Sequence, residues 1–215
     1  MVSLLALGIV AEVSILRAEM TQMIDRAKLE YAAEFREWLD IAFDDPVHQR
    51  VLVLPPDTVV NGDLEVDWSD ALRGKQIVAI VARGDLTVKG NVRNADLEGG
   101  PLLFVGGTLR ARHLDKDGAN FVILGNVELE GIALCEYNHG VLRVGRDLKA
   151  QALINLDHDV LVSGKTSGKA ASSEESALRE VLVPEVFDLA NDPEATWPDS
   201  SLIRKRMAAG KPVLR

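Results

Sequence analysis

Apolar and polar residues alternate along the middle of the chain in a phrase that returns about every 20 residues. Two or three alternating aliphatic residues lead to a tight step, usually at glycine. An aliphatic, a polar and a second aliphatic residue follow that step. The step falls at positions 62, 84, 107, 125, 146 and 164, with spacings of 22, 23, 18, 21 and 18 residues. The copies span residues 60–66, 82–88, 105–111, 123–129, 144–150 and, in degenerate form, 162–167.

This period predicts a solenoid in which each repeat is one stacked unit. Strict alternation is typical of β-strands, and neither a helical pattern nor the phrase of leucine-rich repeats occurs inside the repeats. We therefore predict a mainly β, single-domain parallel β-helix of either hand, with about six coils of roughly 20 residues and helices at both ends. One inward ladder should contain Leu64, Leu86, Leu109, Val127 and Leu148.

Residues 1–43 precede the repeats and have apolar positions in steps of three or four, as in an amphipathic helix. The apolar face would either pack on the solenoid or pair with another protein, including a second copy in a homodimer. The first eleven residues are uncharged and apolar, but they are too few to cross a bilayer and lack the basic start of a signal peptide. We therefore expect a soluble, cytoplasmic protein.

Two further helical segments follow the repeats. The string Ser172-Ser173-Glu174-Glu175 is typical of a helix start, and that helix should end at Pro184. Asp199-Ser200 should cap a second helix over residues 201–209. We expect an N-terminal helical segment over residues 1–45 that ends at Asp44-Asp45-Pro46, β-helix repeats over 46–168 and a C-terminal helical cap over 169–215. Such helices would cover strand edges that otherwise invite pairing.

Composition and charge narrow the functional classes. The chain has 215 residues, 47% of them hydrophobic and only 5% aromatic, which suits a narrow aliphatic interior. Its net charge is −9, although the last fifteen residues hold five Lys or Arg and no acid. The acidic charge of the rest of the chain argues against nucleic-acid binding. It favours either a basic protein partner or a role in solubility alone. The single cysteine, Cys135, excludes an internal disulfide framework and is expected to be a buried small hydrophobe.

No recognised catalytic motif occurs in the sequence, and the glycines recur singly with the repeat. The four histidines are His48, His113, His139 and His158, three of which fall near carboxylates at predicted corners. A metal site at one edge is one interpretation, but no His-x-His or Cys-x-x-Cys spacing supports it. Hydrogen bonding of the turns is the other interpretation, and it is preferred. We expect no catalysis, no metal and no cofactor.

The string Tyr137-Asn138-His139-Gly140 places an aromatic ring, an amide and an imidazole at one predicted corner. These residue types make good interface anchors. The alternative is an ordinary turn closed by Asn138 with His139 on the surface.

The repeat phrases resemble the Gly-Asp-Leu-x-Val repeats of bactofilin-like, polymer-forming cytoskeletal β-helix proteins. A helix-flanked bacterial group of this kind carries a Gly-x-Tyr-Asn-x-Gly corner, which is similar to residues 135–140 here, with Cys135 in place of the first glycine. The tail of that group resembles residues 183–186 and 208–215, so the resemblance covers roughly residues 50–215. The motifs of this resemblance are specific for the fold but say little about activity. The resemblance also implies an association with bacterial toxin–immunity loci.

We therefore predict a non-catalytic, protein-binding β-solenoid, an immunity protein that neutralises a cognate bacterial toxin by direct binding. The toxin would present a basic cleft if it acted on nucleic acid or nucleotides. The alternatives are a bactofilin-like scaffold that self-assembles and a β-helix acyltransferase or lyase, whose strict hexapeptide repeat is missing. The predicted binding residues are Glu65, Asp67, Asp85, Glu128, Glu130, Glu136, Tyr137, Asn138 and His139.

Overall fold

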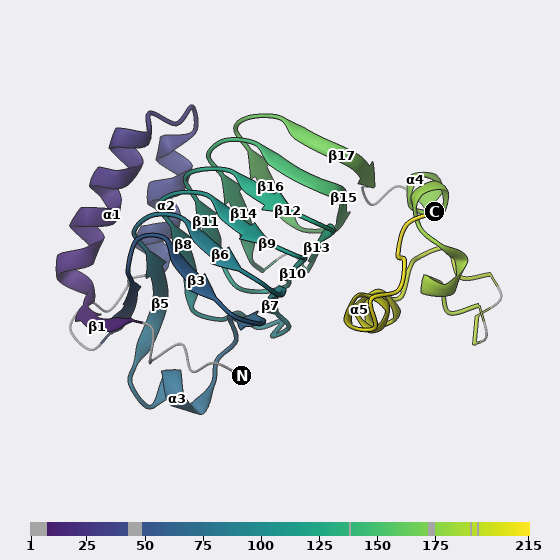
Figure 1. Ribbon diagram of the computed structural model, residues 1–215, viewed down its shortest axis with the longest axis horizontal. Helices are drawn as coiled ribbons and strands as arrows, with labels where there is room; N and C mark the ends of the chain where they lie inside the picture. The colour runs from purple at the N-terminus through teal and green to yellow at the C-terminus, as the bar shows by residue number, and fades with distance from the viewer. Residues whose placement is uncertain (1–7, 43–48, 138, 172–174, 190, 193) are drawn as a thin grey trace.

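The protein is a parallel β-solenoid with helices packed on its flanks (Figure 1). The computed structural model describes residues 8–42, 49–137, 139–171, 175–189, 191–192 and 194–215. The predicted mainly β solenoid is confirmed. The expected starts and stops at Ser172-Ser173-Glu174 and Asp44-Asp45-Pro46 lie outside the described residues.

One seven-stranded sheet forms the first side of the solenoid. Its order is β1-β2-β5-β8-β11-β14-β16, and all neighbours from β2 onward are parallel. The strands are β1 (Ile9–Glu12), β2 (Arg50–Leu54), β5 (Ile77–Ala82), β8 (Leu102–Val105), β11 (Phe121–Ile123), β14 (Val141–Val144) and β16 (Asp159–Val162). Only β1 runs antiparallel, and it covers the edge of β2 with Val10 opposite Leu52.

The other sheet folds into two rows, which form the second and third sides. The second side consists of β3 (Thr58–Val60), β6 (Leu86–Val88), β9 (Leu109–Ala111) and β12 (Val127–Leu129). The third side consists of β4 (Leu64–Glu65), β7 (Val92–Asn94), β10 (Leu114–Lys116) and β13 (Ile132–Glu136). Two longer strands, β15 (Leu148–Leu156) and β17 (Thr166–Ala171), run through both rows.

The solenoid has about 4 turns, and the expectation of six coils was wrong. Four turns contain three separate strands, from β2-β3-β4 to β11-β12-β13. The repeats at positions 146 and 164 still continue the sheets, but in them the second and third sides merge into one strand. The nine-residue strand β15 pairs with β12 through Leu148 and with β13 through Ala152, so no separate third strand forms. The repeat count therefore overestimated the number of complete three-sided turns.

The predicted inward ladder is correct for four of its five residues. Leu86, Leu109, Val127 and Leu148 are register partners on successive strands of the second side. Leu64 was placed wrongly, because it pairs with Val92 on the third side.

The reason is that Gly62 begins the second corner of its coil, while Pro56 occupies the first corner. A Cβ on Gly84 would lie 3.2 Å from Pro56 Cβ, whereas one on Gly90 would lie 2.7 Å from the Gly62 carbonyl carbon. The Pro56 corner lacks a glycine and was not recognised as a copy of the phrase.

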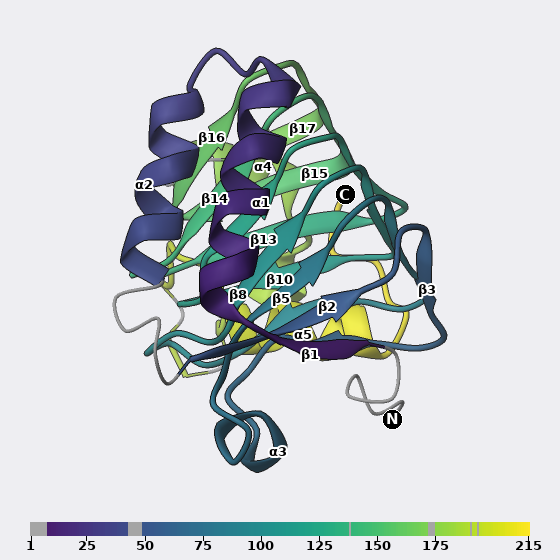
Figure 2. The same ribbon diagram turned by 90° about the vertical axis from the view of Figure 1, so that its left-hand side faces the viewer.

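Two helices cover the outer face of the first side. α1 (Val13–Ala27) and α2 (Ala32–Ala42) lie across this sheet (Figure 2). The side chains that meet there are buried in one cluster, which includes Leu16, Met20, Ile24, Phe35, Leu39, Val51, Ala79, Phe104 and Val122. The expected single helix is wrong in two places. Ile9–Glu12 is a strand, and Lys28, with φ of +50°, separates α1 from α2. The apolar face thus packs on its own solenoid.

The C-terminal segment packs on the outside of the third side. It contains α4 (Glu175–Val181), a short 3-10 helix η2 (Pro184–Val186) and α5 (Ser200–Ala208). Its buried side chains include Leu178, Ile203 and Met207, which cluster with Leu134 and Ile154. The predicted end before Pro184 is confirmed, and so is the cap, since Asp199 Oδ1 accepts from Ser201 N–H at 2.7 Å. Strand β17 continues to Ala171, past the expected boundary at residue 168.

In the described part of the chain, no helix combines the length and the apolar character needed to cross a membrane.

Candidate functional site

A column of polar side chains runs inside the solenoid along the third corner, where the third side turns back to the first. Asn94, Lys116, Cys135 and Asn155 are register partners on β7, β10, β13 and β15. Successive side chains of a strand point to opposite faces, so Lys116 points inward together with the buried Leu114 two positions before it. This column lies next to the loops that form the third corners.

Lys116 is completely buried, and its ammonium group meets three acceptors. Nζ donates to the carbonyl oxygens of Asp117, at 3.1 Å, and Ala119, and it lies 2.7 Å from Nε2 of His158. The Phe121 ring centroid is 5.2 Å from Nζ. Three donors therefore face three acceptors. Burial nevertheless lowers the pKa of Lys116 to about 7.

His158 connects Lys116 to the next corner of the column. Its Nδ1–H donates to the Tyr137 carbonyl, which leaves Nε2 as the acceptor for Lys116. Asn155 holds the backbone of His158 on both sides, with distances of 2.9 Å to its N–H and 3.0 Å to its carbonyl. Burial and then the neighbouring Lys116 lower the pKa of His158 to about 4. The imidazole is therefore neutral at neutral pH.

Cys135 occupies the column between Lys116 and Asn155. It is a free, fully buried thiol, as the sequence predicted. Burial raises its pKa to about 12, so it is a neutral thiol at neutral pH.

On the outer side of the same corners, charged side chains cluster around two buried carboxylates, Asp115 and Asp117. Arg204 on α5 places Nε 2.9 Å from Asp115, and Nη2 lies 2.6 Å from Asp117 and 3.1 Å from Glu136. Arg93 lies 3.8 Å from Asp115. Asp115 and Asp117 are each 1% exposed, and burial raises the pKa of Asp117 to about 7 although Arg204 opposes this. Arg204 therefore links α5 to two neighbouring strands.

The third corner after β13, called here the Tyr137 corner, brings an aromatic ring and an imidazole together at the surface. The rings of Tyr137 and His139 lie 4.5 Å apart at a tilt of 57°. Tyr137 is half-buried with φ of +71°, a left-handed conformation that costs free energy in a non-glycine residue, while His139 is exposed. The backbone carbonyl of Tyr137 accepts a hydrogen bond from His158. The preceding residue, Glu136, forms an ion pair with Arg204. The third predicted member, Asn138, lies outside the described residues.

The predicted acidic residues lie on different sides of the solenoid. Asp85 lies in the corner before β6 and Glu128 on β12 of the second side, and Arg110 bridges them at 2.7 and 2.9 Å. Asp67 lies at the first of the third corners and accepts from the backbone N–H groups of Ala95 and Asp96. The remaining three are Glu65 on β4, Glu130 after β12 and Glu136 at the end of β13. Only Glu136 is next to Tyr137 and His139.

Two of the described histidines hydrogen-bond the backbone, whereas His139 contacts the Tyr137 ring. His113 Nδ1 accepts from the Ile132 N–H at 3.0 Å, and His158 bonds as above. His48 lies outside the described residues. Among the described side chains, no group of three or more His, Cys, Asp or Glu could hold a metal ion.

Sequence reasoning missed Lys116 and Arg204. Alternation from Leu114 could have placed Lys116 inward, since residues i and i+2 share a face. Arg204 gave no such signal, because its carboxylate partners are 87 and 89 residues away.

The buried Lys116–His158 pair holds a backbone turn in place, whereas Tyr137 is half-buried and His139 exposed at the surface of that corner. Comparison of the chain with protein-family models, curated proteins and solved structures gives no match. The resemblance to bactofilin-like proteins therefore stays a prediction.

Proposed function

We propose that this chain is a protein-binding module whose Tyr137 corner, the turn over residues 136–140 between β13 and β14, docks into a partner. The observation that carries the proposal is that the buried Lys116–His158 network holds the backbone carbonyl of Tyr137, whose ring contacts His139. An aromatic anchor that is held before binding loses little conformational freedom in the complex. Such a surface suits recognition and needs no catalytic group.

The partner that we propose is a bacterial toxin, and the chain acts as its immunity protein. The family resemblance supports this class of partner. The net charge of −9 supports a basic target, because long-range attraction speeds encounter with an oppositely charged surface. A toxin that acts on nucleic acid or nucleotides would present such a surface.

Co-expression with the toxin encoded beside this chain tests the proposal. Cells should survive only when the chain is present, and the two proteins should elute together in gel filtration. Tyr137→Ala should weaken the complex by about tenfold or more, as expected for an aromatic hot spot. Tyr31→Ala is the matched control, because Tyr31 is the only other tyrosine and is 38% exposed. Equal killing with and without the chain, together with no complex in gel filtration, would sink the immunity proposal.

A second candidate function is a self-assembling scaffold. Within the described chain, β16 pairs only with β14, and β17 pairs only with β15, so both have a free strand edge. Free edges favour pairing with a second copy. At the opposite end, the antiparallel β1 covers β2, which disfavours continued parallel stacking on the first side. Electron microscopy of the intact chain separates the two functions, because the scaffold requires filaments.

A further inference from the structure

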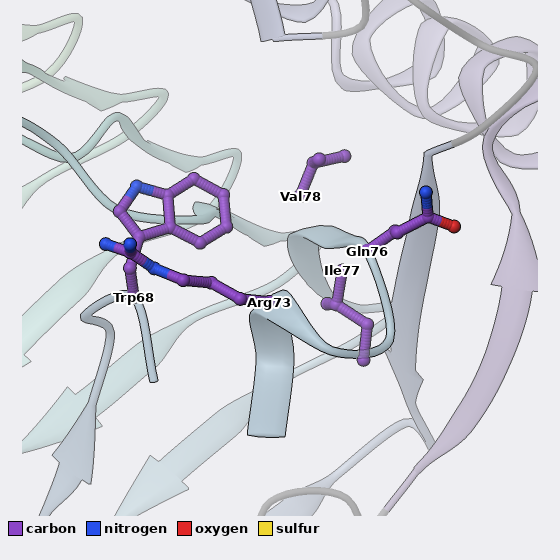
Figure 3. Close-up of a pocket in the computed structure, with 5 residues that line it drawn as sticks. All are labelled: Trp68, Arg73, Gln76, Ile77 and Val78. Atoms are coloured by element: carbon purple, nitrogen blue, oxygen red, sulfur yellow. The ribbon is translucent and has the colours of Figure 1, made fainter. Parts of the chain in front are cut away.

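A pocket of about 420 Å³ lies near the beginning of the solenoid, away from the Tyr137 corner. The side chains around it are shown in Figure 3, and they belong to Trp68, Arg73, Gln76, Ile77 and Val78. They come from the connection between β4 and β5, which contains the short helix α3 (Asp70–Arg73), and from the start of β5. This connection projects from the first coil (Figure 2).

The connection is a built structure that holds the pocket wall in place. Ser69 caps α3, since its Oγ accepts from the Leu72 N–H at 3.3 Å, and Leu72 itself is buried in the solenoid core. Gln76 has φ of +56°, which turns the chain into β5 at the pocket. The wall is therefore ordered by a cap, a core contact and a turn.

Two hydrogen-bond donors at this pocket lack acceptors within the described chain. No hydrogen bond or ion pair joins the guanidinium of Arg73 or the indole N–H of Trp68 to another described residue. Arg73 is exposed and Trp68 is half-buried. Figure 3 draws both side chains among those that line the pocket, so both groups belong to its wall. Trp and Arg are the residue types most enriched at binding hot spots.

We propose that this pocket binds a carboxylate flanked by apolar side chains, carried by an acidic peptide segment of a protein partner. The guanidinium forms charge-assisted hydrogen bonds to a carboxylate, and the indole N–H can donate one more. The Trp68 ring and Val78 supply an apolar wall for the neighbouring side chain. Because the rim residues Arg73 and Gln76 are exposed, the hollow suits a segment that lies across it. This site is independent of the partner proposed for the Tyr137 corner.

Nuclear magnetic resonance on the intact chain provides the test, with the indole N–H signal of Trp68 as the reporter. The probe is an acetylated and amidated leucine-glutamate-leucine tripeptide, and the control probe replaces glutamate with glutamine. The glutamate peptide should shift the Trp68 signal in a saturable way. The glutamine peptide should bind roughly tenfold more weakly, because a charge-assisted hydrogen bond is lost.

Two variants each remove one positive charge from the connection between β4 and β5. Arg73→Gln should weaken binding of the glutamate peptide by roughly tenfold. Lys75→Gln should leave it unchanged, since Lys75 is exposed but does not line the pocket. The proposal is overturned if both peptides shift Trp68 equally, if no saturable shift occurs, or if Arg73→Gln binds like the parent.

Discussion

At the scale of single residues, the buried lysine shows how this interior tolerates a charge. Moving an ammonium group out of water costs several kcal/mol, and hydrogen bonds must offset that cost. Lys116 meets acceptors on Asp117, Ala119 and His158, which are parts of two different corners. The lysine thus orders the loop after β10 and the loop after β15 at once, and His158 in turn holds the Tyr137 carbonyl.

The protonation of His158 should make unfolding sensitive to acid. In the unfolded chain His158 binds a proton below about pH 6.5, but in the folded chain only below about 4. Between these values the unfolded state holds more protons, so acidification favours unfolding. As the pH falls through this window, the free energy of unfolding of the parent should drop by about 3 kcal/mol more than that of His158→Gln, which does not titrate. Urea titrations at several pH values measure both curves, and parallel curves would contradict the assignment.

At the scale of elements, the inward and outward faces of each strand should respond differently to the same new charge. Val127 is fully buried in the solenoid ladder, whereas Thr87 faces outward beside Arg110. Val127→Asp should lower the free energy of unfolding by about 4 kcal/mol, because it buries an unpaired carboxylate. Thr87→Asp should change it by less than about 0.5 kcal/mol. Thermal melts give the comparison, and equal stability of both variants with the parent would refute the inward placement of the ladder.

The attachment of α5 should depend on Arg204. Removing this side chain leaves Asp115 and Asp117 sealed without their main counter-charge, which costs about 3 kcal/mol. Arg204→Gln should therefore speed amide hydrogen exchange over residues 200–208. The change should shrink on acidification, since a protonated carboxyl needs no counter-charge.

Lys205→Gln is the matched control, because Lys205 is an exposed cation on the same helix. It should leave the exchange of residues 200–208 unchanged. If both variants exchange alike, the cluster does not hold α5.

At the scale of the whole molecule, the flanking helices of the described chain cover the first and third sides of the solenoid. They leave the second side uncovered, and within the described residues the edges of β16 and β17 have no further strand beside them. α1 and α2 cover the first side, and the C-terminal helices cover the third (Figure 1). The second side carries polar pairs such as Arg110 with Glu128. Because exposed ion pairs are easily solvated, this side is suited to face water.

The intact chain should remain a monomer or a dimer at high concentration. The antiparallel strand β1 covers the edge of β2, so parallel coils cannot stack there without displacing it. Sedimentation velocity measures the species present. Removal of residues 1–12 exposes this edge and should produce larger assemblies. Filaments formed by the intact chain would instead favour the scaffold function.

The sequence by itself determined the features that depend on local rules. Alternating aliphatic residues predict strands, because side chains two positions apart share a face. Recurring glycines predict stacked coils, because they allow backbones of neighbouring coils to approach closely. A Cβ on Gly125, for example, would lie 2.5 Å from the Gly107 carbonyl oxygen of the coil below. The Asp199 cap and the end before Pro184 are equally local. Alternation also predicted that Leu109 and Val127 face inward.

Only the tertiary structure decided which local phrases meet and what surrounds them. Leu64 has the same phrase as Leu86 but joins another side, because the first corner of its coil is built by Pro56. The partners of Lys116 and Arg204 lie up to 42 and 89 residues away, in loops whose order depends on the stacking of coils. Ile9–Glu12 reads as helix but becomes a strand, because the free edge of β2 offers backbone partners that the local pattern does not contain.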